Sequence, residues 1–315
     1  MERRKVICVV GPTACGKTTL GVLLAKKYGG EVVSADSMQI YRGMTIGTAA
    51  PTEAEMQGVP HHMIAVADPA EQWSAAEYVQ RATPVVDDIL ARGRLPVIVG
   101  GTGLWMDALL RGHGFAKGSA GGAVRRELET RFEQEGIEPL LAELRQVDPD
   151  SAVRLHPADT KRILRALEVY RETGQTITAH NVATRAMPDR YSAVKIGLRF
   201  ADREDMKALI DRRVDKMAAE GLLTEVRALL DRGLPKNATA MQAIGYKEFL
   251  GVLDGTLTEP EALELVKLRS RQYAKRQLTW LRRDQDIHWI EWGKQRDFAR
   301  ALQISTEILA ASGLG

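Results

Sequence analysis

The segment Gly11–Thr18 reads Gly-Pro-Thr-Ala-Cys-Gly-Lys-Thr and matches the phosphate-binding pattern G-x-x-x-x-G-K-[ST]. In such a loop, consecutive backbone N–H groups point at one anion, and the following helix adds the partial positive charge of its N-terminus. Lys17 would reach the outer phosphates, and the Thr18 hydroxyl would hold Mg²⁺. The motif is typical of ATP- and GTP-binding proteins and predicts a site for a phosphorylated compound.

Predicted strands bring further polar residues to this loop. The apolar run 6–10 precedes the loop, and an amphipathic helical pattern follows it from Thr18 to Tyr28. A second apolar run ends at Asp36, and a third ends in the Gly-Gly-Thr-Gly turn at 100–103. Ligands bind at the carboxyl ends of parallel strands, so Asp36 is expected beside the loop. Two other roles for Asp36 stay open, a helix N-cap and an indirect Mg²⁺ ligand.

The order of the patterns predicts an α/β fold, a P-loop NTPase-like parallel sheet core with a helical insertion domain. Five glycines between 112 and 122 suggest a linker, and only helical periodicity follows as far as Gly174. Residues 175–190 are polar and are predicted to be a connector. We therefore assign 1–115 and 191–315 to the core and 116–190 to the insertion. The later core elements are predicted as a strand at 193–198, a helix from 202 to 232 broken near Gly221, a helix at 260–283 and an edge strand at 287–290.

A basic segment lies near the end of the chain. Lys267 to Arg283 holds seven Lys or Arg residues and no Asp or Glu, with Tyr273 and Trp280 among them. At helical spacing Arg269, Tyr273, Arg276, Trp280 and Arg283 fall near one face, which suits contact with a nucleic-acid backbone and stacking on bases. When the segment is taken alone, a solvated basic face is the favoured interpretation.

Composition limits the alternatives. The 315 residues carry a formal charge of only +3, so any nucleic-acid surface must come from local clustering. Cys8 and Cys15 are expected in a strand and in the phosphate loop, which argues against a disulfide and for a reducing compartment. The first residues lead directly into a strand, so we expect no cleavable signal sequence, and no apolar run is long enough to span a membrane. No zinc-site spacing is present.

With these segments in view, the chain resembles the bacterial isopentenyl-tRNA transferase family along nearly its whole length. The resemblance is carried by ordered matches at 11–18, 34–44 (Ser-Ala-Asp-Ser-Met-Gln-Ile-Tyr-Arg-Gly-Met), 46–49 (Ile-Gly-Thr-Ala), 60–62 (Pro-His-His), 99–104 (Val-Gly-Gly-Thr-Gly-Leu), 165–169 (Arg-Ala-Leu-Glu-Val), 243–248 (Ala-Ile-Gly-Tyr-Lys-Glu) and 271–280 (Arg-Gln-Tyr-Ala-Lys-Arg-Gln-Leu-Thr-Trp).

The resemblance implies an activity. Such enzymes transfer a dimethylallyl group from dimethylallyl diphosphate to the exocyclic N6 amine of the adenosine 3′-adjacent to the tRNA anticodon, releasing diphosphate. It implies Mg²⁺ as cofactor, the tRNA anticodon stem-loop as partner, an insertion that contacts the anticodon loop and a cytoplasmic location. A monomer is the default expectation. The implied catalytic residues are Asp36, as general base, and Thr102. The implied diphosphate-binding residues are Gly11, Thr13, Ala14, Cys15, Gly16, Lys17, Thr18 and Arg213, with Thr18 at the metal. The implied tRNA-binding residues are Ser37, Gln39, Arg162, Arg165, Lys275, Arg276, Gln277 and Trp280.

Three other functions stay open at this point. A prenyltransferase acting on a free adenine nucleotide would need neither the basic helix nor the insertion. A small-molecule kinase would use the loop for phosphoryl transfer and would not need a basic helix. A non-enzymatic RNA-binding protein would have no use for an intact Lys17, Thr18 and Asp36. Prenyl transfer to tRNA accounts for all of these features together.

Overall fold

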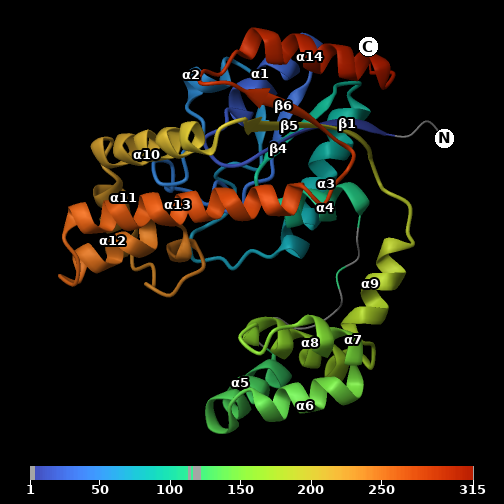
Figure 1. The fold of residues 1–315 in the computed structure, drawn as a ribbon, viewed down its shortest axis with the longest axis vertical. Coiled ribbons are helices and arrows are strands. Elements are labelled where there is room, and N and C mark those ends of the chain that lie inside the picture. Colours follow the sequence, from blue (N-terminus) through green and yellow to red (C-terminus); the bar gives the residue numbers. More distant parts are fainter. Residues whose placement is uncertain (1–3, 113–114, 116–121, 315) are drawn as a thin grey trace. The chain divides into compact units, whose positions relative to one another are not determined.

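The computed structural model describes residues 4–112, 115 and 122–314 (Figure 1). Contacts divide the chain into two compact units, one formed by Met1–Gly112 and Arg190–Gly315 and the other by His113–Asp189. Most of the predicted linker at 112–122 lies outside the described residues. Each unit is considered by itself below.

The larger unit is built on one six-stranded sheet in the order β3-β2-β4-β1-β5-β6, and every neighbouring pair is parallel. The prediction of a parallel α/β core is thereby confirmed, as is the placement of the last strand at an edge. The strands are β1 (Lys5–Val10), β2 (Glu31–Ser34), β3 (His61–His62), β4 (Pro96–Gly100), β5 (Ser192–Phe200) and β6 (Ile287–Trp292).

Side chains of the central strand alternate between two buried cores. Val6 and Cys8 of β1 pack in the core that holds α3 (Ala75–Ala91) and α4 (Gly103–Arg111). Ile7 and Val9 pack in the core that holds α1 (Lys17–Tyr28) and α14 (Phe298–Ala311). Because both faces are covered, the strand is apolar at nearly every position, as parallel strands usually are. The phosphate loop follows this strand and is therefore held by two cores.

The remaining helices of the larger unit follow β2 and β5. A one-turn helix, α2 (Glu53–Met56), lies in the segment between β2 and β3. The predicted helix at 202–232 is two helices, α10 (Arg203–Ala219) and α11 (Leu222–Asp231), separated at Gly221 with φ of +100°. A 3₁₀ turn, η1 (Ala240–Gln242), and α12 (Tyr246–Leu253) follow. The basic segment forms the C-terminal half of α13 (Glu259–Leu281), which begins with a Thr258–Glu261 capping box.

The smaller unit is helical. It contains α5 (Ala123–Glu135), α6 (Glu138–Val147), α7 (Pro149–Arg154) and α8 (Thr160–Thr173), packed around Leu128, Leu140, Leu144 and Leu167. The prediction of a connector at 175–190 is wrong, because α9 (Ile177–Arg185) forms there. The Thr176 side chain accepts from the Ala179 N–H at 3.0 Å and caps this helix. The Thr176 cap is the local signal in the sequence that marks where this helix begins.

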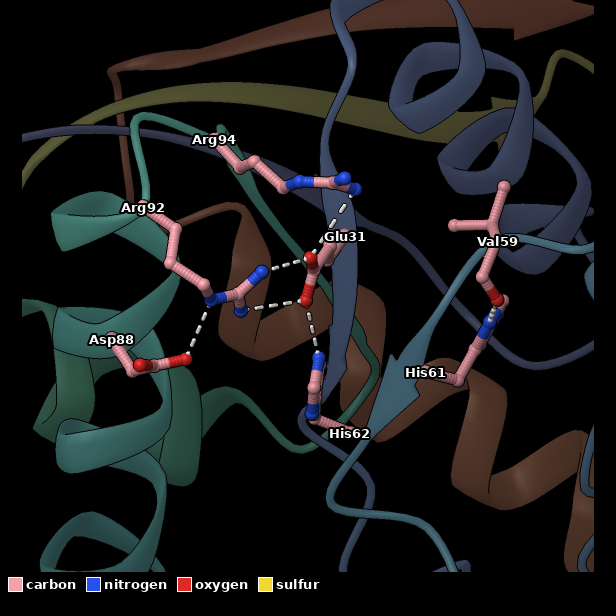
Figure 2. Close-up of polar contacts among 7 residues, drawn as sticks. All are labelled: Glu31, Val59, His61, His62, Asp88, Arg92 and Arg94. Atoms are coloured by element: carbon pink, nitrogen blue, oxygen red, sulfur yellow. Dashed lines mark hydrogen bonds and ion pairs between the residues drawn. The ribbon is translucent and has the colours of Figure 1, made fainter.

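A buried acid lies where β2 begins, at the opposite end of this strand from Asp36. The Glu31 carboxylate, 4% exposed, receives two hydrogen bonds from Arg92 and lies 2.7 Å from His62 Nε2, with Arg94 at 3.4 Å (Figure 2). The Arg92 hydrogen bonds hold the pKa of Glu31 down to about 2 against an ordinary value of 4.5. This cluster ties β2 to β3 and to the turn that precedes β4.

This lowered pKa predicts acid sensitivity. A depressed folded-state pKa contributes stability above pH 4.5, and that contribution is lost as the pH falls toward 2. It amounts to about 3 kcal/mol. Denaturant unfolding at pH 5 and pH 3 should show a steep loss of stability that is much smaller in Glu31→Gln. The control Glu291→Gln, which removes an exposed partner of Arg199, should keep the wild-type pH dependence. Equal acid sensitivity of all three proteins would contradict this account.

Within the described residues, no helix combines the length and apolar character needed to cross a membrane.

Candidate active site

The phosphate loop connects β1 to α1 at the carboxyl end of the sheet. Gly16 has a φ of +90°, and a Cβ atom there would lie 2.7 Å from the ring of Phe298. A side chain at Gly16 is therefore disfavoured both by conformation and by space. Ala14 also has a positive φ, +64°, a conformation that concentrates at ligand-binding loops. Gly16 thus allows both the tight turn of the loop and the close packing of the loop against Phe298 of α14.

Two cations converge on the loop. Lys17 Nζ donates to the Pro12 carbonyl at 2.8 Å, which folds the side chain back over the loop. Burial lowers the pKa of Lys17, and the charge of Arg213 lowers it further while that of Asp36 opposes the shift. Arg213, from α10, donates to the Thr48 carbonyl at 3.4 Å, and burial likewise lowers its pKa. Together the two side chains form a partly desolvated site suited to an anion.

Asp36 directly follows the end of β2. Its Oδ1 atom accepts from the N–H groups of Met38 at 2.9 Å and Gln39 at 3.4 Å. These contacts cap a turn and no helix begins here, so the alternative of a helix N-cap is wrong. Asp36 also lines the cavity described next. A carboxylate has two oxygens, and capping through one is compatible with proton transfer at the other. The Thr102 hydroxyl accepts from the Ser37 N–H at 3.1 Å, which joins the ends of β4 and β2.

A cavity of about 290 Å³ opens at this point, between the strand ends and two helices. Its polar lining includes Thr13, Asp36, Ser37, Thr48 and Arg213. Its apolar lining includes Met38, Ile210, Val214, Met217, Ala243, Ile244 and Val266. A ligand held here would meet charged groups along one part and hydrocarbon along another, as an amphiphilic diphosphate requires.

Tyr273 and Gln277 of α13 point into the core unit. Tyr273 lines the cavity, and burial, reinforced by the charge of Asp36, raises its pKa to about 12. Gln277, 6% exposed, accepts from the Thr13 N–H at 2.8 Å and donates to the Gly101 carbonyl at 3.0 Å. Gln277 is therefore a buried link between α13 and the phosphate loop, and its implied contact with tRNA stays a prediction.

Gln39 also has an internal role. Its amide nitrogen donates to the carbonyls of Thr48 and Ala49, and its oxygen accepts from the Ser34 hydroxyl at 3.3 Å. The side chain thus holds the loop that forms one wall of the cavity, and its contact with the target nucleotide stays a prediction. Ser37, predicted for the same nucleotide, lines the cavity directly.

Three of the predicted tRNA-binding residues do come together. Lys275, Arg276 and Trp280 line a surface groove on α13 with Gln272, Thr279 and Arg283. Arg276 lines both this groove and the cavity, so the two are adjacent. The indole N–H of Trp280 donates to Asp107 at 3.1 Å, and the Arg283 guanidinium lies 5.5 Å from its ring centre. The groove therefore presents cations and an aromatic ring at the cavity mouth.

Arg162 and Arg165 lie on α8, in the smaller unit. Arg162 is 73% exposed and lies 3.8 Å from Asp159. Arg165 donates to the buried Glu168 at 3.0 Å. These two residues are not part of the cavity or the groove of the larger unit, and their contact with tRNA stays a prediction.

Glu225 is a positioning residue that sequence reasoning missed. Its carboxylate accepts from the N–H groups of Thr45, Ile46 and Gly47 and from the Tyr246 hydroxyl at 2.5 Å. One side chain of α11 thereby fixes the loop that supplies Gly47 and Thr48 to the cavity. No local pattern connects a helical glutamate with a loop that lies about 180 residues earlier.

Comparison with known proteins gives one consistent answer. Residues 39–284 match the family described as IPP transferase. The chain is 46% identical over 295 residues to the tRNA dimethylallyltransferase of Geobacillus thermodenitrificans, covering 94% of this chain and 93% of that protein. It is 48% identical over 286 residues to the tRNA dimethylallyltransferase of Symbiobacterium thermophilum, covering 91% and 89%.

Solved structures agree. The tRNA isopentenylpyrophosphate transferase of Bacillus halodurans matches with a TM-score of 0.73 at 41% identity, over 98% of this chain and 96% of that one. A eukaryotic dimethylallyltransferase crystallised acting on tRNA matches with a TM-score of 0.83 at 29% identity, over 98% and 80%. Sequence, fold and site geometry lead to the same conclusion, that this chain belongs to the IPP transferase family.

Proposed function

We propose that this protein transfers a dimethylallyl group from dimethylallyl diphosphate to the exocyclic N6 amine of the adenosine 3′-adjacent to a tRNA anticodon. The observation that carries the proposal is the cavity in which Arg213 and Asp36 adjoin an apolar lining beside the phosphate loop. The charged lining of the cavity matches the diphosphate of the donor, and the apolar lining matches its hydrocarbon group. The proposed reaction is the one for which the relatives are named.

The diphosphate would lie over the loop. The backbone amides of residues 11–18, with Lys17 and Arg213, would stabilise the charge that develops on it as the carbon–oxygen bond breaks. Within the described part of the chain, no group of three His, Cys, Asp or Glu side chains could hold a metal. Mg²⁺ suits such a site, since it takes phosphate oxygens and keeps several waters, with the Thr18 hydroxyl as its protein ligand. Bound there, it would further neutralise the leaving diphosphate.

The acceptor amine would enter at Asp36. Adenine's exocyclic amine is a weak nucleophile, because its lone pair is delocalised into the ring. As the nitrogen–carbon bond forms and the carbon–oxygen bond breaks, the amine proton passes to the Asp36 carboxylate. The Thr102 hydroxyl, joined to the Ser37 backbone, would orient the amine. The base must leave the anticodon-loop stack to reach the cavity.

The groove on α13 would bind the anticodon stem-loop, with Lys275 and Arg276 on phosphates and Trp280 beside a base. The smaller unit would contact the anticodon loop through Arg162 and Arg165. A single copy of the chain supplies all of these residues, which supports a monomer, and a tRNA substrate implies the cytoplasm.

A labelling assay tests the proposal. Purified protein with radiolabelled dimethylallyl diphosphate and Mg²⁺ should label unmodified tRNA that carries adenosine at the third anticodon position and at the next position. Labelling of free AMP in place of tRNA would favour a nucleotide prenyltransferase. ATP-dependent phosphorylation of a metabolite without prenyl transfer would overturn the proposal.

If tRNA binds in the groove on α13, its affinity should depend on salt concentration through the basic residues there. Lys275→Ala should weaken tRNA binding and reduce the slope of log Kd against log salt by about one, because one phosphate contact is lost. Affinity for the donor should not change, since Lys275 does not line the cavity. Filter binding at several salt concentrations measures the slope. Lys216→Ala, on the exposed side of α10, serves as the control. If the two variants share the wild-type slope, tRNA does not bind in this groove.

A further inference from the structure

Four carbonyl groups of the phosphate loop point toward hydrogen-bond donors of the protein. This orientation matters because a cradle of backbone N–H groups binds an anion only if the neighbouring carbonyl oxygens, which repel it, are turned away. The Pro12 carbonyl accepts from Lys17 Nζ at 2.8 Å, and the Gly16 carbonyl accepts from the Leu20 N–H at 3.2 Å. Two of the carbonyls between these positions accept from side chains near the end of the chain.

Trp292, the last residue of β6, holds the first of these two carbonyls. Its indole N–H donates to the Cys15 carbonyl at 2.8 Å, and both residues are buried. The tryptophan packs in the core that holds α1 and α14 (Figure 1) and does not line the cavity. The Cys15 carbonyl therefore points into this core. Because a trans peptide places its C=O and N–H on opposite sides, the N–H of Gly16 points the other way, out of the core.

Arg296 holds the second carbonyl and is linked to Trp292 through Phe298. The Arg296 guanidinium donates to the Ala14 carbonyl at 3.4 Å and lies 5.7 Å from the centre of the Phe298 ring. That ring meets the Trp292 indole edge-on, with 5.3 Å between the ring centres. The Phe298 ring also packs against Gly16 of the loop. We call Trp292, Arg296 and Phe298 the loop brace.

We infer that the loop brace positions the phosphate loop for diphosphate, by keeping the carbonyls of Ala14 and Cys15 turned away from the anion and the N–H of Gly16 turned toward it. The identity of the anion rests on the proposed function. Trp292 makes the larger contribution, because a buried carbonyl that loses its donor is costly. Without the indole N–H, the peptide between Cys15 and Gly16 is free to rotate, and each rotation replaces an attractive N–H by a repulsive oxygen.

The test measures binding of inorganic diphosphate in the presence of Mg²⁺ by calorimetry, which involves neither tRNA nor a prenyl group. Trp292→Phe keeps an aromatic ring in the core and removes the indole N–H. The Kd of diphosphate should rise by about tenfold, the effect of one lost hydrogen bond to a buried group. The kcat/KM for the donor should fall by a similar factor, because the loop amides also stabilise the charge of the leaving group, while the Kd of tRNA should not change.

Trp289→Phe is the matched control for this variant. Trp289 lies on the same strand, but its ring packs against Gly197 of β5 and beside Arg199, so diphosphate binding should stay at the wild-type value. Thermal unfolding shows whether each variant is folded at the assay temperature. A tryptophan that only fills the core would leave the diphosphate affinity of the folded variant unchanged.

Arg296→Met tests the brace independently of the core, because Arg296 is exposed. It should raise the Kd of diphosphate more than Lys294→Met, which removes one charge from the same exposed segment. If Trp292→Phe does not fold, this pair of variants decides.

The two proposals can fail separately. Folded Trp292→Phe and Arg296→Met variants that bind diphosphate as their controls do would overturn the inference. Wild-type protein that binds diphosphate but modifies no tRNA would refute the proposed function alone. Wild-type protein that binds no diphosphate would refute both.

Discussion

Asp36→Asn is expected to lower kcat for tRNA prenylation by about 100-fold or more, while tRNA binding changes little. The amide keeps an oxygen that can accept from Met38 and Gln39, so the turn after β2 should persist. What is lost is the group that takes the amine proton, and a well-placed general base contributes about 10²- to 10⁴-fold. The loss should appear in kcat and in kcat/KM alike, because it acts on the transition state.

The control for this variant is Asp68→Asn. Asp68 is also an aspartate whose Oδ1 accepts from a backbone N–H, that of Ala70 at 2.9 Å, but it is exposed and does not line the cavity. Single-turnover kinetics with saturating tRNA separate the chemical step from product release. Should Asp36→Asn retain wild-type turnover, Asp36 would be a structural cap only, which is the role its contacts with Met38 and Gln39 already show.

Arg213→Met should reduce kcat/KM for the diphosphate donor by about 100-fold or more. Removing one preorganised group that stabilises developing charge commonly costs 10²- to 10³-fold. Arg213 is partly buried, and Asp36 and the phosphate loop are its charged surroundings, so water cannot fully replace it. Methionine keeps most of the side-chain length and packing, which confines the change to charge and hydrogen bonding.

Arg212→Met provides a control on the same helix, one residue away and exposed. Steady-state kinetics against donor concentration, together with the Kd of inorganic diphosphate, distinguish ground-state binding from transition-state stabilisation. In Arg213→Met, kcat/KM for the donor should fall and the Kd of inorganic diphosphate should rise. In Arg212→Met, both should stay near the wild-type values. If Arg213→Met leaves both the donor affinity and the rate unchanged, the diphosphate lies elsewhere in the cavity.

The fold followed from local signals. Except for β3, each strand of the core contains a short apolar run, and most turns at strand ends are marked by Gly or Asp, so periodicity and turn chemistry order most of the elements. β3 consists of two histidines and carries no such signal. The same logic placed Asp36 near the loop, because the carboxyl ends of parallel strands meet at one edge of the sheet, whereas Thr102 was implied by the family resemblance. Helix α9 escaped prediction although Thr176, whose side chain accepts from the Ala179 N–H, marks its start as an N-cap.

Local patterns could not predict which individual side chains face inward and which contacts they make. Gln277 lies in a basic, exposed-looking segment, and only the packing of α13 against Gly101 shows that this position faces inward. A Cβ atom at Gly101 would lie 2.2 Å from the Gln277 amide nitrogen, so the glycine is what admits it. Tyr273 does share a face with Arg276, as the spacing predicted, since both line the cavity, but the spacing alone could not show that this face borders a cavity. Such facts depend on contacts across more than 170 residues.

The two hydrogen bonds of Gln277 have a thermodynamic consequence. They join the helix that carries the tRNA groove to Thr13 of the phosphate loop, so a displacement of α13 also displaces a loop amide. If tRNA favours one position of this helix, its binding must change donor affinity, and the donor must change tRNA affinity by the same factor. Gln277→Leu should reduce that factor toward one in titrations of either ligand with and without the other. Substrate binding would then be cooperative through one buried amide, in addition to the contact between the substrates at the reacting atoms.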